Sequence, residues 1–183
     1  GMLKPLKAYS KTSIGAVPIG QEVGVTALQL ACAISAVANG GLYFKPYIIK
    51  EVRDKHDEKI DEFKPQCLRR VISADTSQRL KTILAGVIEV GTGKLAKSKD
   101  YKFAGKTGTA QKIDSGGGYS HSNFFASFIG FAPVENPRLA IVVVFDEPHP
   151  YYYGGVVAAP VFKDVAERAL KYLEVKESLS NVT

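Results

Sequence analysis

Two neighbouring apolar runs, at residues 123–132 and 138–146, limit the possible folds of this chain more than any other feature. Both are apolar at consecutive rather than alternate positions, which is typical of strands that are covered on both faces of a sheet. Only residues 133–137, with a proline at each end, separate them, so we expect an antiparallel hairpin. A third strand is predicted at about 101–110. The predicted fold class is therefore α/β of the α+β type, with an antiparallel sheet flanked by helices.

Three helices are predicted around this sheet. Residues 26–39 begin with a capping threonine, contain no charge and stop at two glycines, so we expect a helix that is apolar on nearly all sides. A second helix, at 73–90, is amphipathic and is capped by Ser73. A final helix is predicted to open at Pro160, because proline is favoured in the first helical turn. The helix at 26–39 has no polar side, so it needs more protein around it than its immediate neighbours supply.

The remaining segments predict a simple organisation of the chain. Residues 1–25 are punctuated by proline and glycine and are expected to form an extended or looped lead-in to a domain at 26–176. The polar residues 177–183 are expected to form a tail. Strands at 43–52 and 59–63 flank a charged turn and predict a peripheral hairpin.

Composition and charge argue against several classes of protein. The chain has 183 residues, 45% of them hydrophobic, and lacks the run of about 20 apolar residues that a membrane helix needs, so no anchor is expected in it. The net charge is +6, but the lysines are scattered among acids, so nucleic-acid binding is not expected. The cysteines and histidines have no metal-ligand spacing, and no metal or other cofactor is predicted. His121 and Asp146 would allow a triad with a serine, but any chain of this size offers such combinations.

Residues 106–109, Lys-Thr-Gly-Thr, place a cation and two hydroxyls on one predicted strand. Alternation puts the side chains of Thr107 and Thr109 on one face and that of Lys106 on the other. The Thr109 N–H could donate to a carbonyl oxygen, and the two hydroxyls could bind a carboxylate. Gly108 would let a ligand approach the backbone closely. The alternative is a solvated turn that binds nothing.

Two glycine-rich segments lie on either side of this motif. Gly91-Thr92-Gly93 partly matches a nucleotide-binding loop, but it closes a helix and precedes a strand instead of the reverse. We therefore interpret it as a helix C-cap and connection. Residues 112–122, which contain three consecutive glycines, predict a mobile loop directly after the motif.

Six segments follow one another along the chain at residues 20–30, 38–41, 91–93, 104–111, 128–133 and 159–162. In this order they resemble the C-terminal half of class B penicillin-binding proteins, in particular the division- and sporulation-type transpeptidases. Lys-Thr-Gly-Thr matches one of the three short motifs of that family. The resemblance covers about residues 14–175 and implies an incomplete penicillin-binding/β-lactamase-like transpeptidase domain.

The resemblance implies a D,D-transpeptidase that crosslinks peptidoglycan stem peptides through an acyl-serine intermediate and is acylated by β-lactams. Lys106 would then lie beside the nucleophile and support proton transfer. Thr107 and Thr109 would bind the carboxylate of the substrate or antibiotic, with Gly108 allowing its approach, and the Thr109 amide would help to form the oxyanion hole. Gln111 would lie where the strand continues along the bound peptide, which could pair with the strand edge.

The two other family motifs, Ser-x-x-Lys and Ser-x-Asn or Ser-Asp-Asn, do not occur in the sequence. Without a nucleophile or a base, this chain alone is expected to be catalytically inactive. The simplest explanation is a truncated domain whose N-terminal half is missing and whose exposed surfaces could self-associate. The parent protein would lie at the periplasmic or extracellular face of the cytoplasmic membrane. The alternative is a noncatalytic substrate-binding or scaffold module.

Overall fold

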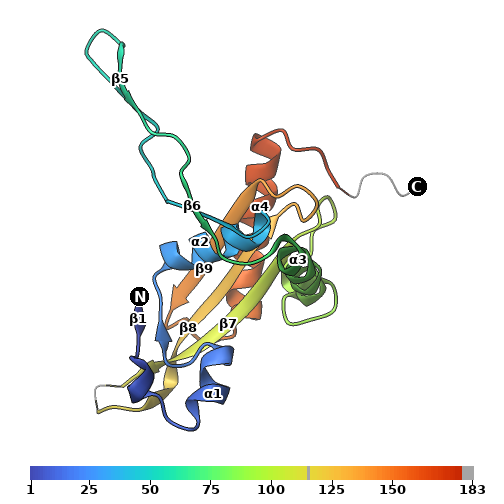
Figure 1. Ribbon diagram of the computed structural model, residues 1–183. Helices are drawn as coiled ribbons and strands as arrows, with labels where there is room; N and C mark the ends of the chain where they lie inside the picture. Colours follow the sequence, from blue (N-terminus) through green and yellow to red (C-terminus); the bar gives the residue numbers. More distant parts are fainter. Residues whose placement is uncertain (115, 179–183) are drawn as a thin grey trace.

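The sheet predicted from the apolar runs is the centre of the molecule (Figure 1). The computed structural model describes residues 1–114 and 116–178. A three-stranded antiparallel sheet has the order β7-β8-β9, where the strands are β7 (Ala104–Ile113), β8 (Tyr119–Ala132) and β9 (Leu139–Asp146). The predicted fold class, an antiparallel sheet flanked by helices, is confirmed.

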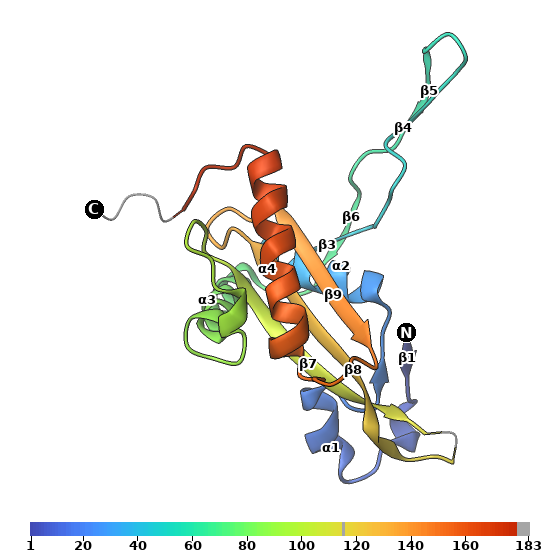
Figure 2. The same cartoon turned by 180° about the vertical axis from the view of Figure 1, so that it is seen from behind.

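Helices lie on both faces of this sheet and beside it. They are α2 (Ala27–Ala38), α3 (Ala74–Glu89) and α4 (Gly154–Tyr172). Figure 2 shows α4 across one face, α2 covers the opposite face, and α3 packs beside β7. Alternate residues of β8 face the two layers: Phe128 packs on Phe162 of α4 with 4.7 Å between ring centroids, whereas Phe131 packs with Ile34 of α2. Burial of such side chains stabilises the fold by roughly 25 cal/mol for each Å² of apolar area.

The first two predicted helices, α2 and α3, are confirmed together with their caps. Thr26 Oγ1 accepts from the Gln29 N–H at 3.2 Å, and Gln29 Oε1 accepts from the Thr26 N–H at 2.9 Å, which completes a capping box. Ser73 Oγ accepts from the Thr76 N–H at 3.0 Å. Part of the apolar surface of α2 faces solvent in the described chain, since Leu28 is 60% exposed.

The prediction that the last helix opens at Pro160 is wrong. α4 begins at Gly154 with Tyr153 as its N-cap, and Pro160 lies inside the helix. An interior proline lacks the N–H that would bond to the carbonyl four residues earlier. Pro160 is exposed, whereas Ala159 and Phe162 are fully buried against the sheet. Packing of the buried side therefore carries the helix through the proline.

The predicted peripheral hairpin is a longer ribbon with shorter strands. Its two antiparallel ladders pair β3 (Leu42–Phe44) with β6 (Cys67–Arg70) and β4 (Glu51–Arg53) with β5 (Lys59–Glu62). The sequence analysis missed β6. Pro46 and Pro65 lie between the two ladders. Because proline has no backbone N–H, these residues cannot donate the hydrogen bonds that one continuous ladder would need. Figure 1 shows the ribbon projecting away from the sheet.

Residues 1–25 contain more local structure than the expected extended or looped lead-in. The elements are β1 (Met2–Leu3), which pairs with β2 (Val23–Gly24), α1 (Ser13–Ala16), and 3-10 turns at Leu6–Ala8 and Val17–Ile19. The buried Ser13 hydroxyl donates to Glu22 Oε2 at 2.9 Å, and Lys4 Nζ donates to the same oxygen at 3.1 Å. The Glu22 carboxylate thus joins the residues after β1, the start of α1 and the residues before β2.

The mobile loop predicted at 112–122 is largely an extension of the two strands, since β7 continues to Ile113 and β8 begins at Tyr119. Cross-strand pairing extends as far as these two residues, which face each other. At the C-terminus, the Ser178 N–H donates to the Asp100 carbonyl oxygen at 2.9 Å. The remainder of the predicted tail, residues 179–183, lies outside the described residues.

Candidate active-site strand

β7 is an edge strand of the described sheet, and residues 106–109 lie in its first half. Lys106 Nζ donates to the Thr107 carbonyl oxygen at 2.9 Å, so this carbonyl points to the unpaired edge rather than into the ladder with β8. The N–H and C=O of a strand residue point to the same edge, and the edge alternates from one residue to the next. The N–H groups of Thr107 and Thr109 therefore also face the open edge.

The two threonine side chains point toward the start of α4. Thr107 Oγ1 lies 2.8 Å from Thr92 Oγ1, and Thr109 Oγ1 accepts from the Gly154 N–H at 3.1 Å. Lys106 leaves the strand on the other face, but its bond to the Thr107 carbonyl returns the ammonium to the open edge. Within the described residues Lys106 has no carboxylate partner, so the edge carries an uncompensated positive charge.

Gly108 and Gly154 permit two close approaches at this strand. A Cβ at Gly108 would overlap the Ser127 hydroxyl on β8, and a Cβ at Gly154 would overlap the carbonyl oxygens of both Ser127 and Gly108. Glycine at position 154 lets the first turn of α4 lie directly on β7 and β8, because the atoms that a Cβ would meet there belong to the backbone. At Gly108 the overlap is with a hydroxyl group that can rotate away, so the sheet alone does not require glycine there.

Comparison with known proteins identifies the family of this chain. Residues 1–167 match the family model of the penicillin binding protein transpeptidase domain. This chain belongs to that family. It is 39% identical over 178 residues to stage V sporulation protein D of Bacillus subtilis, an alignment that covers 96% of this chain and 27% of that protein. Identity to PbpB of Mycolicibacterium smegmatis is 35%, over 93% of this chain and 28% of the relative.

Solved structures of class B penicillin-binding proteins superpose closely on this transpeptidase-family chain. Penicillin-binding protein 3 of Mycobacterium tuberculosis in complex with ampicillin gives a TM-score of 0.88 at 33% identity, covering 100% of this chain and 42% of that one. The transpeptidase domain of penicillin-binding protein 3 from Burkholderia pseudomallei gives 0.82 at 33% identity, covering 97% of this chain and 51% of that one. The chain therefore spans about half of a solved transpeptidase domain.

Gln111 of this transpeptidase-family chain is held against the sheet. Its Nε2 donates to the Ser120 carbonyl oxygen at 2.9 Å. The next residue, Lys112, donates to Asp146 Oδ1 at 2.9 Å and to Glu147 Oε1 at 2.7 Å. The hydrogen bonds to Glu147 and Asp146 raise the pKa of Lys112 above its usual range. Together these contacts attach the distal half of β7 to its neighbours.

Sequence reasoning missed Thr92 and Gly154 as neighbours of the motif. The Tyr152 ring, just before α4, stacks on Phe124 of β8 with 4.3 Å between centroids. Thr92 and Gly154 touch the motif from 15 and 45 residues away in the sequence. The only sequence signal was the glycine-rich character of both segments, which indicates a connection but not what it contacts.

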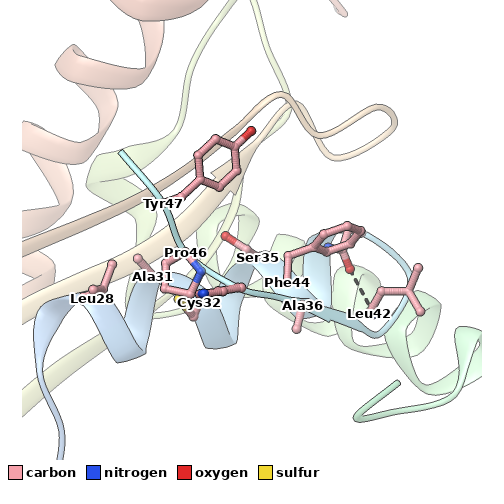
Figure 3. A pocket seen from close by; sticks show the side chains of 11 residues that line it. Leu28, Ala31, Cys32, Ser35, Ala36, Leu42, Phe44, Pro46 and Tyr47 are labelled. Carbon is pink, nitrogen blue, oxygen red and sulfur yellow. Dashed lines mark hydrogen bonds between the residues drawn. The ribbon is translucent and has the colours of Figure 1, made fainter. Parts of the chain in front are cut away.

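Two hollows of the transpeptidase-family chain lie away from the motif. A groove of about 280 Å³ runs between α2 and the base of the ribbon, where Leu28 and Cys32 face Phe44 and Tyr47 (Figure 3). A wider hollow of about 470 Å³ lies beside α1. No residue of β7 lines either one.

Within residues 1–114 and 116–178, no group of three or more His, Cys, Asp or Glu side chains is placed to hold a metal ion. No helix in this part of the transpeptidase-family chain combines the length and the hydropathy needed to cross a membrane.

Proposed function

We propose that this chain supplies the ligand-binding strand of a D,D-transpeptidase that crosslinks peptidoglycan stem peptides through an acyl-serine intermediate. The observation that carries the proposal is the first half of β7, whose open edge holds the Lys106 ammonium and outward N–H groups, with the hydroxyls of Thr107 and Thr109 on the adjoining face toward α4. An extended peptide that ends in a carboxylate complements these groups. Its backbone can pair with the strand edge while its carboxylate accepts hydrogen bonds from the hydroxyls.

Each residue of the motif has a role in this proposal. Thr107 and Thr109 donate their hydroxyl hydrogens to the carboxylate of the stem peptide or of a β-lactam. The Thr109 N–H stabilises the negative charge that develops on the carbonyl oxygen in the tetrahedral intermediate. Lys106 supplies positive charge beside the reacting groups and supports proton transfer. Gly108 lets the ligand approach the backbone, and Gln111 lies where the strand continues along the peptide.

β-lactams are proposed as ligands of the same edge. The penicillin-binding protein 3 structures of Mycobacterium tuberculosis include complexes with ampicillin and aztreonam, and this chain superposes on both with TM-scores of 0.88 and 0.87. Both antibiotics carry an anionic group next to the ring that opens, which suits a strand that presents a cation and two hydroxyl donors.

The reaction also needs a nucleophile and a base, and this chain contains neither Ser-x-x-Lys nor Ser-x-Asn or Ser-Asp-Asn. In the proposed reaction, a serine oxygen attacks the stem-peptide carbonyl and the terminal residue leaves as an amine. The amine of a second stem peptide then displaces the serine. We propose that residues 26–176 act within a longer transpeptidase domain that contributes the serine and its base.

Three consequences of this arrangement belong to the proposal. By itself this chain is not acylated. Apolar surface of α2, such as the exposed Leu28, is covered by the rest of the domain, and in the separate chain it favours self-association. The whole protein acts outside the cytoplasmic membrane. The names of two relatives, stage V sporulation protein D and peptidoglycan D,D-transpeptidase FtsI, support a role in cell-wall synthesis during division or sporulation.

The test uses a chimera in which this chain replaces the matching region of Bacillus subtilis stage V sporulation protein D. Incubation with a fluorescent penicillin should give a covalent adduct on the chimera, detected by gel fluorescence and intact mass. The chimera with alanine in place of the serine of Ser-x-x-Lys and this chain alone should give none.

Two outcomes would contradict the proposal. A stoichiometric adduct on this chain alone would show that one of its own residues is the nucleophile. A chimera that unfolds cooperatively but forms no adduct would favour a noncatalytic binding or scaffold module instead.

A further inference from the structure

Thr92 is joined to the motif strand through its hydroxyl. It lies in the short connection between α3 and the 3-10 turn Lys94–Ala96. The Gly93 N–H donates to the Val87 carbonyl oxygen at 2.9 Å, which closes α3 and fixes the path of the connection. Thr92 Oγ1 then lies 2.8 Å from Thr107 Oγ1, a hydrogen-bonding distance between two hydroxyls.

The start of α4 holds this connection from the other side. A Cβ at Gly155 would overlap the Thr92 carbonyl oxygen and would lie 3.4 Å from Thr107 Cγ2. The second residue of α4, the connection and the motif strand are therefore packed against one another. Because there is no room for a side chain between them, the position of Thr92 relative to Thr107 is fixed by contacts on both sides.

We propose that Thr92 is a positioning residue that orients the Thr107 hydroxyl toward a ligand carboxylate, an inference that rests on the proposed function. In this pair either hydroxyl oxygen can be the donor. When Thr107 donates its hydrogen to a carboxylate, its oxygen can still accept one from Thr92. That bond fixes the Thr107 rotamer and polarises its O–H group, which strengthens the bond to the anion.

Thr109 has the matching arrangement. The Gly154 N–H can only donate, so the Thr109 oxygen is the acceptor and its own hydrogen is left for another group. Each hydroxyl of the motif thus has a neighbour near the start of α4 that can donate to it, a backbone amide in one case and the Thr92 hydroxyl in the other. Both hydroxyls are arranged to donate outward to one anionic group.

The test compares acylation rate constants of the chimera and its Thr92→Val, Thr92→Ser, Thr107→Val and doubly substituted Thr92→Val/Thr107→Val variants with benzylpenicillin and with its methyl ester. Thr92→Val should lower the rate with benzylpenicillin about 3- to 10-fold, and Thr107→Val about 10- to 100-fold, since bonds to charged groups are the stronger ones. Thr92→Ser, which keeps the hydroxyl, should react at nearly the wild-type rate.

The double variant and the ester separate positioning from other roles. If Thr92 acts through Thr107, the double variant should be no slower than Thr107→Val, and Thr92→Val should not slow acylation by the ester, which lacks the carboxylate. Losses that multiply in the double variant, or an equal loss with the ester, would overturn the inference, because Thr92 would then contact the ligand itself or support the fold.

The inference and the proposed function fail in different ways. An unchanged rate in Thr92→Val beside a slowed Thr107→Val would overturn only the role of Thr92. An unreactive wild-type chimera, or a Thr107→Val variant as fast as the wild type, would overturn the proposed function and this inference with it. Thermal unfolding of every variant identifies any loss of rate that comes from loss of the folded protein.

Discussion

The Gly154 N–H donates to Thr109 Oγ1 at 3.1 Å, so the first residue of α4 is joined to the strand that carries Lys-Thr-Gly-Thr. An N–H in the first helical turn has no partner within its own helix. Thr109 supplies that partner from 45 residues away in the sequence. The start of α4 and the geometry of the candidate site therefore depend on each other.

Replacing Gly154 with alanine is expected to destabilise the protein by about 1–3 kcal/mol, because the added methyl group has no space against the carbonyl oxygens of Gly108 and Ser127. The measurement is the free energy of unfolding in urea. Gly86→Ala is the matched control, since nothing lies within 4 Å of a Cβ there, inside α3. The control should stabilise by about 0.5–1 kcal/mol. Similar effects of the two substitutions would argue against close packing of α4 on β7.

Thr109→Val in the chimera should slow acylation by benzylpenicillin about 10- to 100-fold, because it removes a hydrogen bond to a charged group. Thr109→Ser keeps the hydroxyl and should retain most of the rate. The valine also leaves the buried Gly154 N–H without its acceptor, which costs about 1–3 kcal/mol of stability, so unfolding is measured alongside the rate. An equal loss of rate in both variants would show that the hydroxyl is not the group that acts.

Local signals explain why much of the fold could be predicted from the sequence. The caps Thr26 and Ser73 lie three residues from the N–H groups they accept, so the starts of α2 and α3 are encoded within a few positions. The start of α4 is encoded differently. Gly154 and Gly155 are poor helix formers. Only glycine fits there, because a Cβ would overlap the carbonyl oxygens of Ser127, Gly108 and Thr92, so the start of this helix depends on contacts with distant parts of the chain.

The residues of the candidate site also divide into those that the sequence predicts and those that only the fold brings together. The motif residues 106–109 could be proposed because they are consecutive and chemically distinctive. Thr92 could not, since one threonine between two glycines gives no sign that its hydroxyl reaches Thr107. The way in which Lys106 joins the threonines at one edge also depends on a bond to the backbone, which side-chain alternation alone does not predict.

Lys112 is expected to contribute to stability in a pH-dependent way through Glu147 and Asp146. These carboxylates raise its pKa above the ordinary value of 10.5, so folding favours the charged lysine. The contribution is therefore fully present below pH 10.5 and is lost as the pH rises through the higher folded-state pKa. The difference in thermal midpoint between the wild type and Lys112→Gln should stay constant from neutral pH to pH 10.5, where both carboxylates are charged, and shrink above it.

Lys112→Arg is the control for this prediction, because arginine stays charged throughout that range. The difference in thermal midpoint between Lys112→Arg and Lys112→Gln should persist at the high pH where the difference between the wild type and Lys112→Gln disappears. A wild-type difference that does not change with pH would mean that Lys112 stabilises the sheet through its uncharged stem and not through its charge, whether that charge acts on the carboxylates or on the Phe125 ring, over which its Nζ lies at 4.9 Å.

Glu22 is expected to have the opposite pH dependence. The hydrogen bond from Ser13, followed by that from Lys4, lowers the pKa of Glu22 below its ordinary value of 4.5, so folding favours the carboxylate. The contribution is present above pH 4.5 and is lost as the pH falls through the lower folded-state pKa. Thermal midpoints of the wild type and Glu22→Gln should therefore differ above pH 4.5 and converge in more acidic solution.

Ser13→Ala tests the cause of the Glu22 effect. Because the Ser13 hydroxyl is the largest influence on the pKa of Glu22, removing it should narrow the pH range over which the wild-type carboxylate stays charged. In the Ser13→Ala background, the effect of Glu22→Gln should be smaller and should disappear at a higher pH than in the wild type. If that effect is unchanged in the Ser13→Ala background, Lys4 rather than Ser13 is the partner that holds the carboxylate in the folded lead-in.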